Sequence, residues 1–320
     1  MSTTWLKVKK YPKIIFGTYQ LGGSFFVGSR PNGYSNSNEG DIRDAIKLAI
    51  KNNINIFDTA NFYGYGKSEI ILGELVGRIN NVKICTKIGQ EVINGQQTYI
   101  RTIKDFERQF IESSKRLRRN KIDLVYLHSP IPDSIEAKVG LEFLRKIKSA
   151  DKIGAIGISV RKFDRSDPSA DIKWAVKQKV DVIQFPLNLF DPATQFSAKK
   201  FLKSKEVDLV ARMPFSSGML SAKEFKLRIF PTNDHRSVLW PVSKQLEFYS
   251  KMENGLIKAQ MTVDNLKEIA WRYTISNQPN AVLVGINNSS QIKETLYLNK
   301  LPHFSQEQIR NYIKGFGKYA

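Results

Sequence analysis

The chain has 320 residues, one cysteine, three histidines and a formal net charge of +20. A single cysteine excludes a disulfide framework, and the few histidines form no cluster with metal-ligand spacing, so no metal is expected. No stretch reaches the ~18 apolar residues that a membrane span needs, and the first residues lack the apolar core of a signal peptide. We therefore expect a soluble, cytoplasmic protein that forms one domain over residues 1–320.

The positive charge alone suggests attraction to nucleic acid, an acidic surface or a phosphorylated ligand. The lysines, however, are scattered along the whole chain. Their densest cluster, in residues 115–121, reads as the C-terminal end of a helix, where cations complement the helix dipole. We therefore expect no specific nucleic-acid partner and no membrane partner.

Short β-rich runs alternate along the chain with amphipathic helical segments. The predicted strands cover residues 14–18, 55–59, 82–87, 124–128, 155–159, 182–187, 209–213 and 281–285. The predicted helices cover residues 41–52, 67–75, 104–118, 134–149, 171–178, 193–204, 263–276 and 290–298. Eight strands that are each followed by a helix favour a closed (β/α)₈ barrel, or TIM barrel, over an open doubly wound sheet.

Three segments depart from the minimal repeat of strand and helix. Residues 5–12 are expected to form a strand or hairpin that covers the bottom of the barrel. The long connection at 220–261, after the seventh strand, is expected to carry a helix near 242–253 and to shape or cover a substrate. Residues 306–319 are read as a C-terminal helix.

Four polar residues lie at or just beyond the ends of the second, third and fourth predicted strands. Asp58 ends the second strand and Tyr63 follows it, while Lys87 and His128 end the next two. In a barrel these ends face one pocket. A phenol gives up its proton more readily beside a cation such as Lys87, an ionised Asp58 would orient that cation, and a histidine can bond the same substrate oxygen.

Each of these residues also has an ordinary structural interpretation. Asp58 can cap a turn, Tyr63 can pack within a loop, Lys87 can be a solvated strand end, and His128 can be a hydrogen-bonded core histidine. Their joint occurrence at three consecutive strand ends favours catalysis.

The run Asp58-Thr59-Ala60-Asn61-Phe62-Tyr63-Gly64 matches the pattern Asp-Thr-Ala-x-x-Tyr-Gly, and Ser68-Glu69 with Leu72-Gly73 continues it. On these motifs, and on the positions of Lys87 and His128, the chain resembles the aldo-keto reductases, particularly their broad bacterial branch. The resemblance implies an NAD(P)H-dependent oxidoreductase that reduces an aldehyde or ketone, including sugar-like ones, or catalyses the reverse. Tyr63 would be its general acid and base.

The resemblance also implies positions for the cofactor. Ser159 and Gln184, beside Asp58, would bind the nicotinamide carboxamide, and Thr18 would lie near the ribose. The loop at Arg212, Pro214, Ser217 and Gly218 would hold the pyrophosphate, and Gly285, Gln291 and Glu294 would lie at the adenosine end.

Four departures from the family pattern concern the cofactor. Val160 and Thr295 replace two usual asparagines, Arg212 replaces an aromatic residue that often stacks on the nicotinamide, and 287–291 lacks an arginine that often binds a 2′-phosphate. The basic charge and the resemblance still favour NADP(H) over NAD(H).

Several alternatives stay open on sequence alone. Gly66-Lys67-Ser68 mimics the end of a P-loop, but Asn61 stands where the first glycine is required, so Ser68 is expected to cap the following helix. A nicotinamide-binding, redox-sensing regulatory subunit with little turnover is the main alternative function, and a nucleic-acid-binding barrel is another. The sequence does not specify the physiological substrate, the favoured direction or the oligomeric state.

Overall fold

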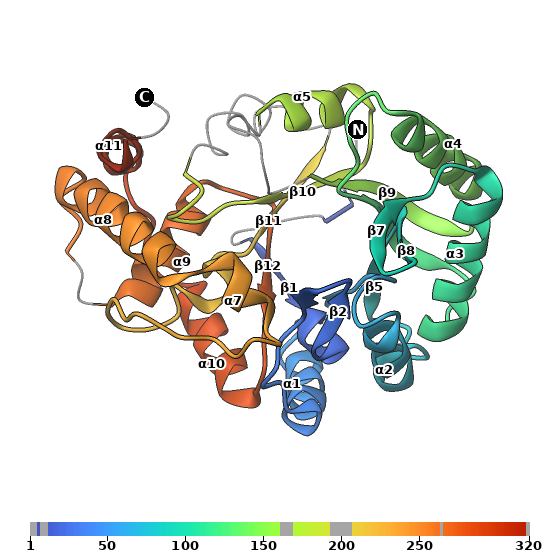
Figure 1. Ribbon diagram of the computed structural model, residues 1–320, viewed down its shortest axis with the longest axis horizontal. Helices are drawn as coiled ribbons and strands as arrows, with labels where there is room; N and C mark the ends of the chain where they lie inside the picture. The colour runs from blue at the N-terminus through green and yellow to red at the C-terminus, as the bar shows by residue number, and fades with distance from the viewer. Residues whose placement is uncertain (1–4, 7–11, 161–168, 193–206, 263–264, 318–320) are drawn as a thin grey trace.

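The computed structural model describes residues 5–6, 12–160, 169–192, 207–262 and 265–317. Eight parallel strands close into a barrel, because β12 pairs with β11 on one side and with β1 on the other (Figure 1). In barrel order the strands are β1 (Lys13–Gly17), β4 (Ile56–Asp58), β5 (Lys83–Ile88), β8 (Ile122–His128), β9 (Ile153–Ser159), β10 (Val182–Pro186), β11 (Asp208–Arg212) and β12 (Ala281–Gly285). The predicted (β/α)₈ barrel is confirmed, with strand bounds that differ by at most two residues.

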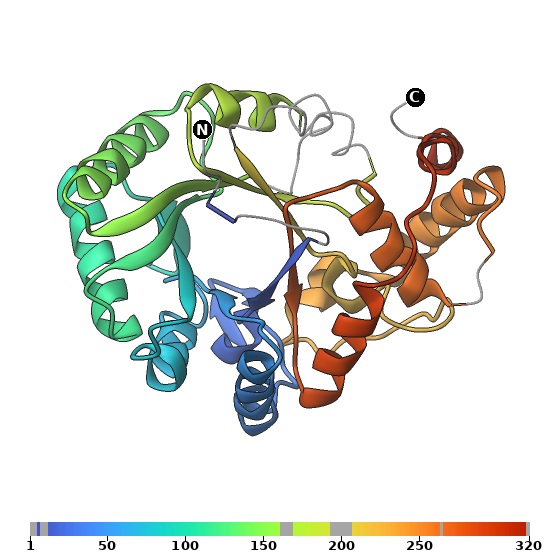
Figure 2. The ribbon, with the colours of Figure 1, turned by 180° about the vertical axis from the view of Figure 1, so that it is seen from behind.

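Helices form an outer ring around the strands (Figures 1 and 2). They are α1 (Glu39–Lys51), α2 (Lys67–Val76), α3 (Ile103–Leu117), α4 (Ile135–Ser149), α5 (Ser169–Lys177), α9 (Leu266–Ser276) and α10 (Ser289–Leu298). The long connection after β11 carries α7 (His235–Leu239) and α8 (Val242–Lys258), and α8 packs against the C-terminal α11 (Gln306–Phe316). The helix predicted at 193–204 lies outside the described residues.

Polar N-caps fix where many of these helices begin. In each case the cap side chain accepts a hydrogen bond from a backbone N–H of the first turn, which would otherwise lack a partner. Such caps are Asn38, Thr102, Ser134, Asn265, Asn288 and Ser305. The cap predicted at Ser68 is wrong: α2 begins after Gly66, which has φ 91° and no side chain with which to cap.

Strand periodicity divides the buried side chains into two sets. One set points inward and fills the barrel, because alternate residues of a strand face the same side. It comprises Leu6, Ile15, Ile56, Cys85, Leu124, Tyr126, Ala155, Val182, Val210, Ala281 and Leu283. The Tyr126 ring fits only because Gly157 faces it, since a Cβ at Gly157 would lie 2.3 Å from Tyr126 Cδ1.

Leu6 closes the end of the barrel at which the strands begin. Its side chain is buried among the interior residues, and its N–H donates to Asp208 Oδ2 at 2.7 Å. Trp5 and Leu6 form a bend rather than a strand, and residues 7–11 of the predicted hairpin lie outside the described residues.

Two antiparallel hairpins, which were not predicted from the sequence, follow β1 and β5. The first pairs β2 (Phe25–Val27) with β3 (Arg30–Asn32), and the second pairs β6 (Gln90–Ile93) with β7 (Gln96–Tyr99). The second turns at Asn94-Gly95, where both φ angles are positive, 51° and 75°. Asn-Gly is a strong hairpin signal and could have revealed it. Two short 3₁₀ turns, η1 (Tyr19–Gly22) and η2 (Ser216–Gly218), complete the elements.

No helix among the described residues is both long and apolar enough to cross a membrane.

Candidate active site

Because alternate residues of each strand point into the barrel, the strands also position the residues of the site. Six strands each carry an apolar or small residue that points into the barrel. Two positions later, at the carboxyl end of the barrel, each of these strands has a polar residue. These residues are Asp58, Lys87, His128, Ser159, Gln184 and Arg212. All six were predicted as site residues, and the structure brings them to one mouth of the barrel.

Lys87 lies buried between Asp58 and Tyr63. Its ammonium forms an ion pair with Asp58 Oδ1, donates to Thr59 O at 2.9 Å, and lies 4.9 Å from the centre of the Tyr63 ring. Burial acts to lower the pKa of Lys87, but the charge of Asp58 and then Tyr63 raise it above its usual value. The ammonium therefore stays protonated beside the phenol.

Gln184 joins the carboxylate of this pair to Ser159. Its Nε2 donates to Asp58 Oδ2 at 2.9 Å, and its Oε1 accepts from the Ser159 hydroxyl at 3.1 Å. All three side chains are buried. Both Asp58 oxygens therefore have partners, one cationic and one neutral, which fixes the orientation of the carboxylate.

His128 presents a neutral imidazole to the same region. Its ring meets the Tyr63 ring edge-on, with 6.2 Å between centres. Burial, followed by the positive charges of Lys87 and Arg212, lowers the pKa of His128 well below its usual value. A neutral imidazole can donate one hydrogen bond without adding charge to the site.

Ser68 has a different role from the predicted helix cap. Its hydroxyl donates to Thr18 O at 2.8 Å and lies 2.9 Å from the hydroxyls of both Thr18 and Thr59. Thr18 in turn donates to Asp58 O at 2.9 Å. These buried contacts tie the loop after β1 to the end of β4, and so position Thr18 beside Asp58.

A cavity of about 830 Å³ opens at this mouth of the barrel. Every residue predicted to contact substrate or cofactor lines it, including those at the expected pyrophosphate and adenosine ends, namely Pro214, Ser217, Gly218, Gly285, Gln291 and Glu294. Glu294 forms an ion pair with Lys267, which also lines the cavity. Six cationic side chains and two carboxylates line it: Arg30, Lys87, Arg212, Arg228, Arg236 and Lys267, with Asp58 and Glu294.

Asp234 fastens two walls of the cavity to each other. Its buried carboxylate pairs with Arg236 at 2.7 Å and accepts from the Ser35 N–H at 3.1 Å and hydroxyl at 3.2 Å. The Arg236 guanidinium lies 4.8 Å from the centre of the Tyr34 ring. The segment before α7 is thereby held against the segment that follows the β2–β3 hairpin.

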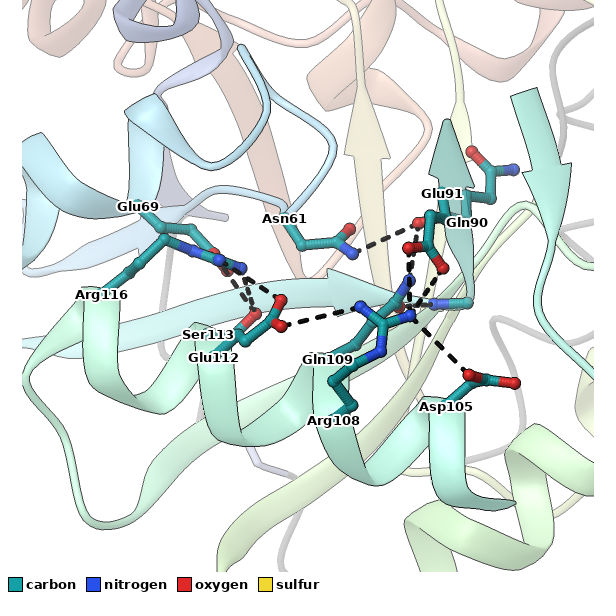
Figure 3. A network of polar contacts seen from close by, with 11 residues as sticks. Asn61, Glu69, Gln90, Glu91, Asp105, Arg108, Gln109, Glu112, Ser113 and Arg116 are labelled. Carbon is teal, nitrogen blue, oxygen red and sulfur yellow. Dashed lines mark hydrogen bonds and ion pairs between the residues drawn. The ribbon is translucent and has the colours of Figure 1, made fainter. Parts of the chain in front are cut away.

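The β6–β7 hairpin forms another wall and is fixed from behind by α3 (Figure 3). Gln109 accepts from the Gly89 N–H and donates to Gln90 O, both at 3.0 Å. Asn61, two residues before Tyr63, also donates to Gln90 O at 3.2 Å. Arg108 pairs with Glu91 at 2.7 Å. The loop that carries Tyr63 and the hairpin therefore share one support.

The outer wall of the cavity was not predicted from the sequence. Its side chains come from η1, from the segment after β3 and from the two hairpins, and they include Tyr19, Arg30, Asn32, Tyr34, Gln90, Gln97 and Tyr99. The only available signal was the Asn94-Gly95 turn, because these residues carry no recurring motif.

Comparisons with known proteins agree with this geometry. The profile of the Aldo/keto reductase family matches residues 13–314. The aldo-keto reductase YhdN of Bacillus subtilis is 26% identical over 232 residues, which cover 70% of this chain but 65% of that protein, just under two thirds. L-galactose dehydrogenase of Arabidopsis thaliana is 25% identical over 92% of this chain and 86% of its own length.

A solved structure shows the same fold. The holo form of the aldo-keto reductase AKR11C1 from Bacillus halodurans superposes with a TM-score of 0.74 at 19% identity, covering 100% of this chain and 96% of that chain. From the profile match over nearly its whole length, the chain belongs to the aldo/keto reductase family of oxidoreductases.

Proposed function

We propose that this protein is an NAD(P)H-dependent reductase of aldehydes or ketones, and that Tyr63 is its general acid. The observation that carries the proposal is the buried Lys87 ammonium, which lies between the Asp58 carboxylate and the Tyr63 ring at the cavity floor. A permanently protonated lysine beside a phenol stabilises the phenolate that remains after proton transfer. The reduced nicotinamide would supply the hydride when bound.

Tyr63 would donate its proton to the carbonyl oxygen as negative charge develops there. His128, kept neutral by burial and by nearby cations, would donate a hydrogen bond to the same oxygen. Asp58 would hold Lys87 in place, because its own orientation is fixed by Gln184. In the reverse reaction the Tyr63 phenolate would act as the base.

The side chains along the cavity suit a nicotinamide dinucleotide. Ser159 and Gln184 offer a hydroxyl and an amide for the carboxamide, and Thr18 offers a hydroxyl near the ribose. The loop at 212–218 would hold the pyrophosphate, and Gly285, Gln291 and Glu294 the adenosine. We infer a preference for NADPH over NADH, because six cations against two carboxylates favour a ligand with an additional phosphate.

The outer part of the cavity suits a substrate rich in hydroxyl groups. Neutral amides from Asn32, Asn36, Gln90 and Gln97 line it together with tyrosine rings. Amides can both donate to and accept from hydroxyl groups, and aromatic rings pack against the apolar faces of sugars. We therefore infer a sugar-like carbonyl substrate, a class that the relative named L-galactose dehydrogenase also indicates.

Two measurements test this function. The first is titration of the protein with NADPH and with NADH, followed through cofactor fluorescence. The second is consumption of the better-bound cofactor in the presence of a panel of sugars, aldehydes and ketones. Saturable binding with turnover of one panel member is expected. Binding without turnover on any of them would favour the redox-sensing alternative, and absence of binding would overturn the proposal.

A further inference from the structure

Arg212 places a half-buried positive charge at the cavity wall, with no carboxylate of the described residues within ion-pair distance. Its Nη2 donates to Val160 O and its Nη1 contacts Met213 Sδ, both at 3.0 Å. Its Nε is buried and has no hydrogen-bond partner. Among the described residues, no carboxylate oxygen lies within salt-bridge distance of this guanidinium, whereas Lys87, Arg236 and Lys267 each have an acidic partner.

The charged groups that line the cavity beside Arg212 do not pair with it, and Asp191, which does not line the cavity, attracts it only from beyond ion-pair distance. Lys87 and Asp58 neutralise each other, and His128 is uncharged because its pKa lies well below the usual value through burial and the charges of Lys87 and Arg212. Burial lowers the pKa of Arg212 itself, against the attraction of Tyr63, Asp191 and Asp58. A guanidinium nevertheless keeps its proton in proteins, so the charge remains.

This charge lies beside the residues proposed to hold the nicotinamide carboxamide. Arg212 bonds to the carbonyl of Val160, the residue after Ser159, and the Val160 N–H donates to Gln184 O at 2.8 Å. Ser159 and Gln184 are themselves hydrogen-bonded.

We propose that Arg212 makes the cavity discriminate between the two redox states of the cofactor, binding the reduced form preferentially. The inference rests on the proposed function. A reduced nicotinamide ring is neutral, whereas an oxidised ring carries one positive charge, and the phosphates are identical in both. An unpaired cation near the ring raises the free energy of the oxidised complex alone, which favours uptake of the reduced cofactor and release of the oxidised one.

The quantity to measure is the ratio of two dissociation constants, Kd for NADP⁺ divided by Kd for NADPH, by calorimetry without substrate. Arg212→Met and Arg212→Gln remove the charge, and the glutamine can still donate to Val160 O. Both variants should lower the ratio by about tenfold or more, chiefly by tightening NADP⁺. Arg212→Lys keeps the charge and should keep a ratio close to that of the wild type.

Arg228→Met is the matched control. Arg228 also lines the cavity, but its guanidinium donates to Gly218 O at 3.0 Å, in the loop proposed to hold the pyrophosphate. Removing its charge should weaken both redox forms by the same factor and leave the ratio unchanged. The same calorimetry on the wild type separates the two proposals, since failure of both cofactors to bind would contradict the proposed function.

Two results would overturn the inference while leaving the reductase intact. One is a ratio that stays the same in Arg212→Met and Arg212→Gln although both cofactors bind. The other is an equal fall of the ratio in Arg228→Met, which would show a general charge effect rather than one specific to Arg212.

Discussion

Gln184 donates a 2.9 Å hydrogen bond from Nε2 to Asp58 Oδ2, on the oxygen that Lys87 leaves free. An ion pair and a hydrogen bond thus connect an ammonium, a carboxylate and an amide of β5, β4 and β10 at the carboxyl end of the barrel. The contacts continue to Ser159, so the orientation of Lys87 depends on residues from three other strands.

This arrangement predicts the effect of changing Gln184. Gln184→Glu would put a second carboxylate against Asp58, and two buried carboxylates this close cannot both stay ionised. We expect the free energy of unfolding to fall by about 2 kcal/mol or more. Gln184→Met removes the donor without adding charge and should cost less. Urea unfolding of both variants shows which of them loses more unfolding free energy. A Gln184→Glu protein as stable as the wild type would contradict the prediction.

The neutral His128 predicts a pH dependence of stability. Its folded pKa lies well below the usual 6.5, so at lower pH the unfolded chain binds a proton that the folded chain does not. The contribution of His128 to the free energy of unfolding is therefore fully present above about pH 6.5. It is lost as the pH falls, by up to about 1.4 kcal/mol per pH unit. Urea unfolding at several pH values should show this loss in the wild type and less of it in His128→Asn. His303→Asn, at an exposed histidine, is the control, and equal slopes in wild type and His128→Asn would refute the prediction.

The Asp234 contact predicts that one carboxylate supports the cavity wall. Asp234→Asn leaves Arg236 without its ionic partner at a buried site, and the expected loss is about 3 kcal/mol of unfolding free energy. Asp44→Asn breaks the exposed pair with Lys47 and should cost less than about 1 kcal/mol. Thermal unfolding distinguishes the two, and similar small losses would show that Asp234 does not hold the wall.

The contacts of Gln109 predict that this residue affects substrate binding although it does not line the cavity. Gln109→Leu keeps the size of the side chain but leaves the buried Gly89 N–H without its acceptor, at a cost of about 1–3 kcal/mol. Because the same side chain supports the β6–β7 hairpin, KM for the substrate should rise more than kcat falls. Glu107→Gln, nearby on α3 and exposed, gives the comparison. An unchanged KM would show that the hairpin keeps its place without Gln109.

Much of the fold and the inner site could be predicted from the sequence, for a physical reason. The strands are apolar runs, so the polar residue that ends a run stands out, as at Asp58, Lys87 and His128. Resemblance to a known family then added Ser159 and Gln184.

The outer wall could not be predicted in this way. Tyr34 and Arg236 meet through Asp234, and their segments lie about 200 residues apart in the sequence, where no local pattern connects them. Ser68 was wrongly predicted as a helix cap because the local rule ignored the buried hydroxyls of Thr18 and Thr59, which come from other segments.

The most direct test of the central claim is the turnover of Tyr63→Phe, with the Kd for NADPH measured on the same preparation. If Tyr63 donates the proton, kcat should fall by roughly 10²–10⁴-fold while the Kd stays close to that of the wild type. A variant that binds NADPH normally and reduces the same substrate at nearly the wild-type rate would contradict the assignment of the acid.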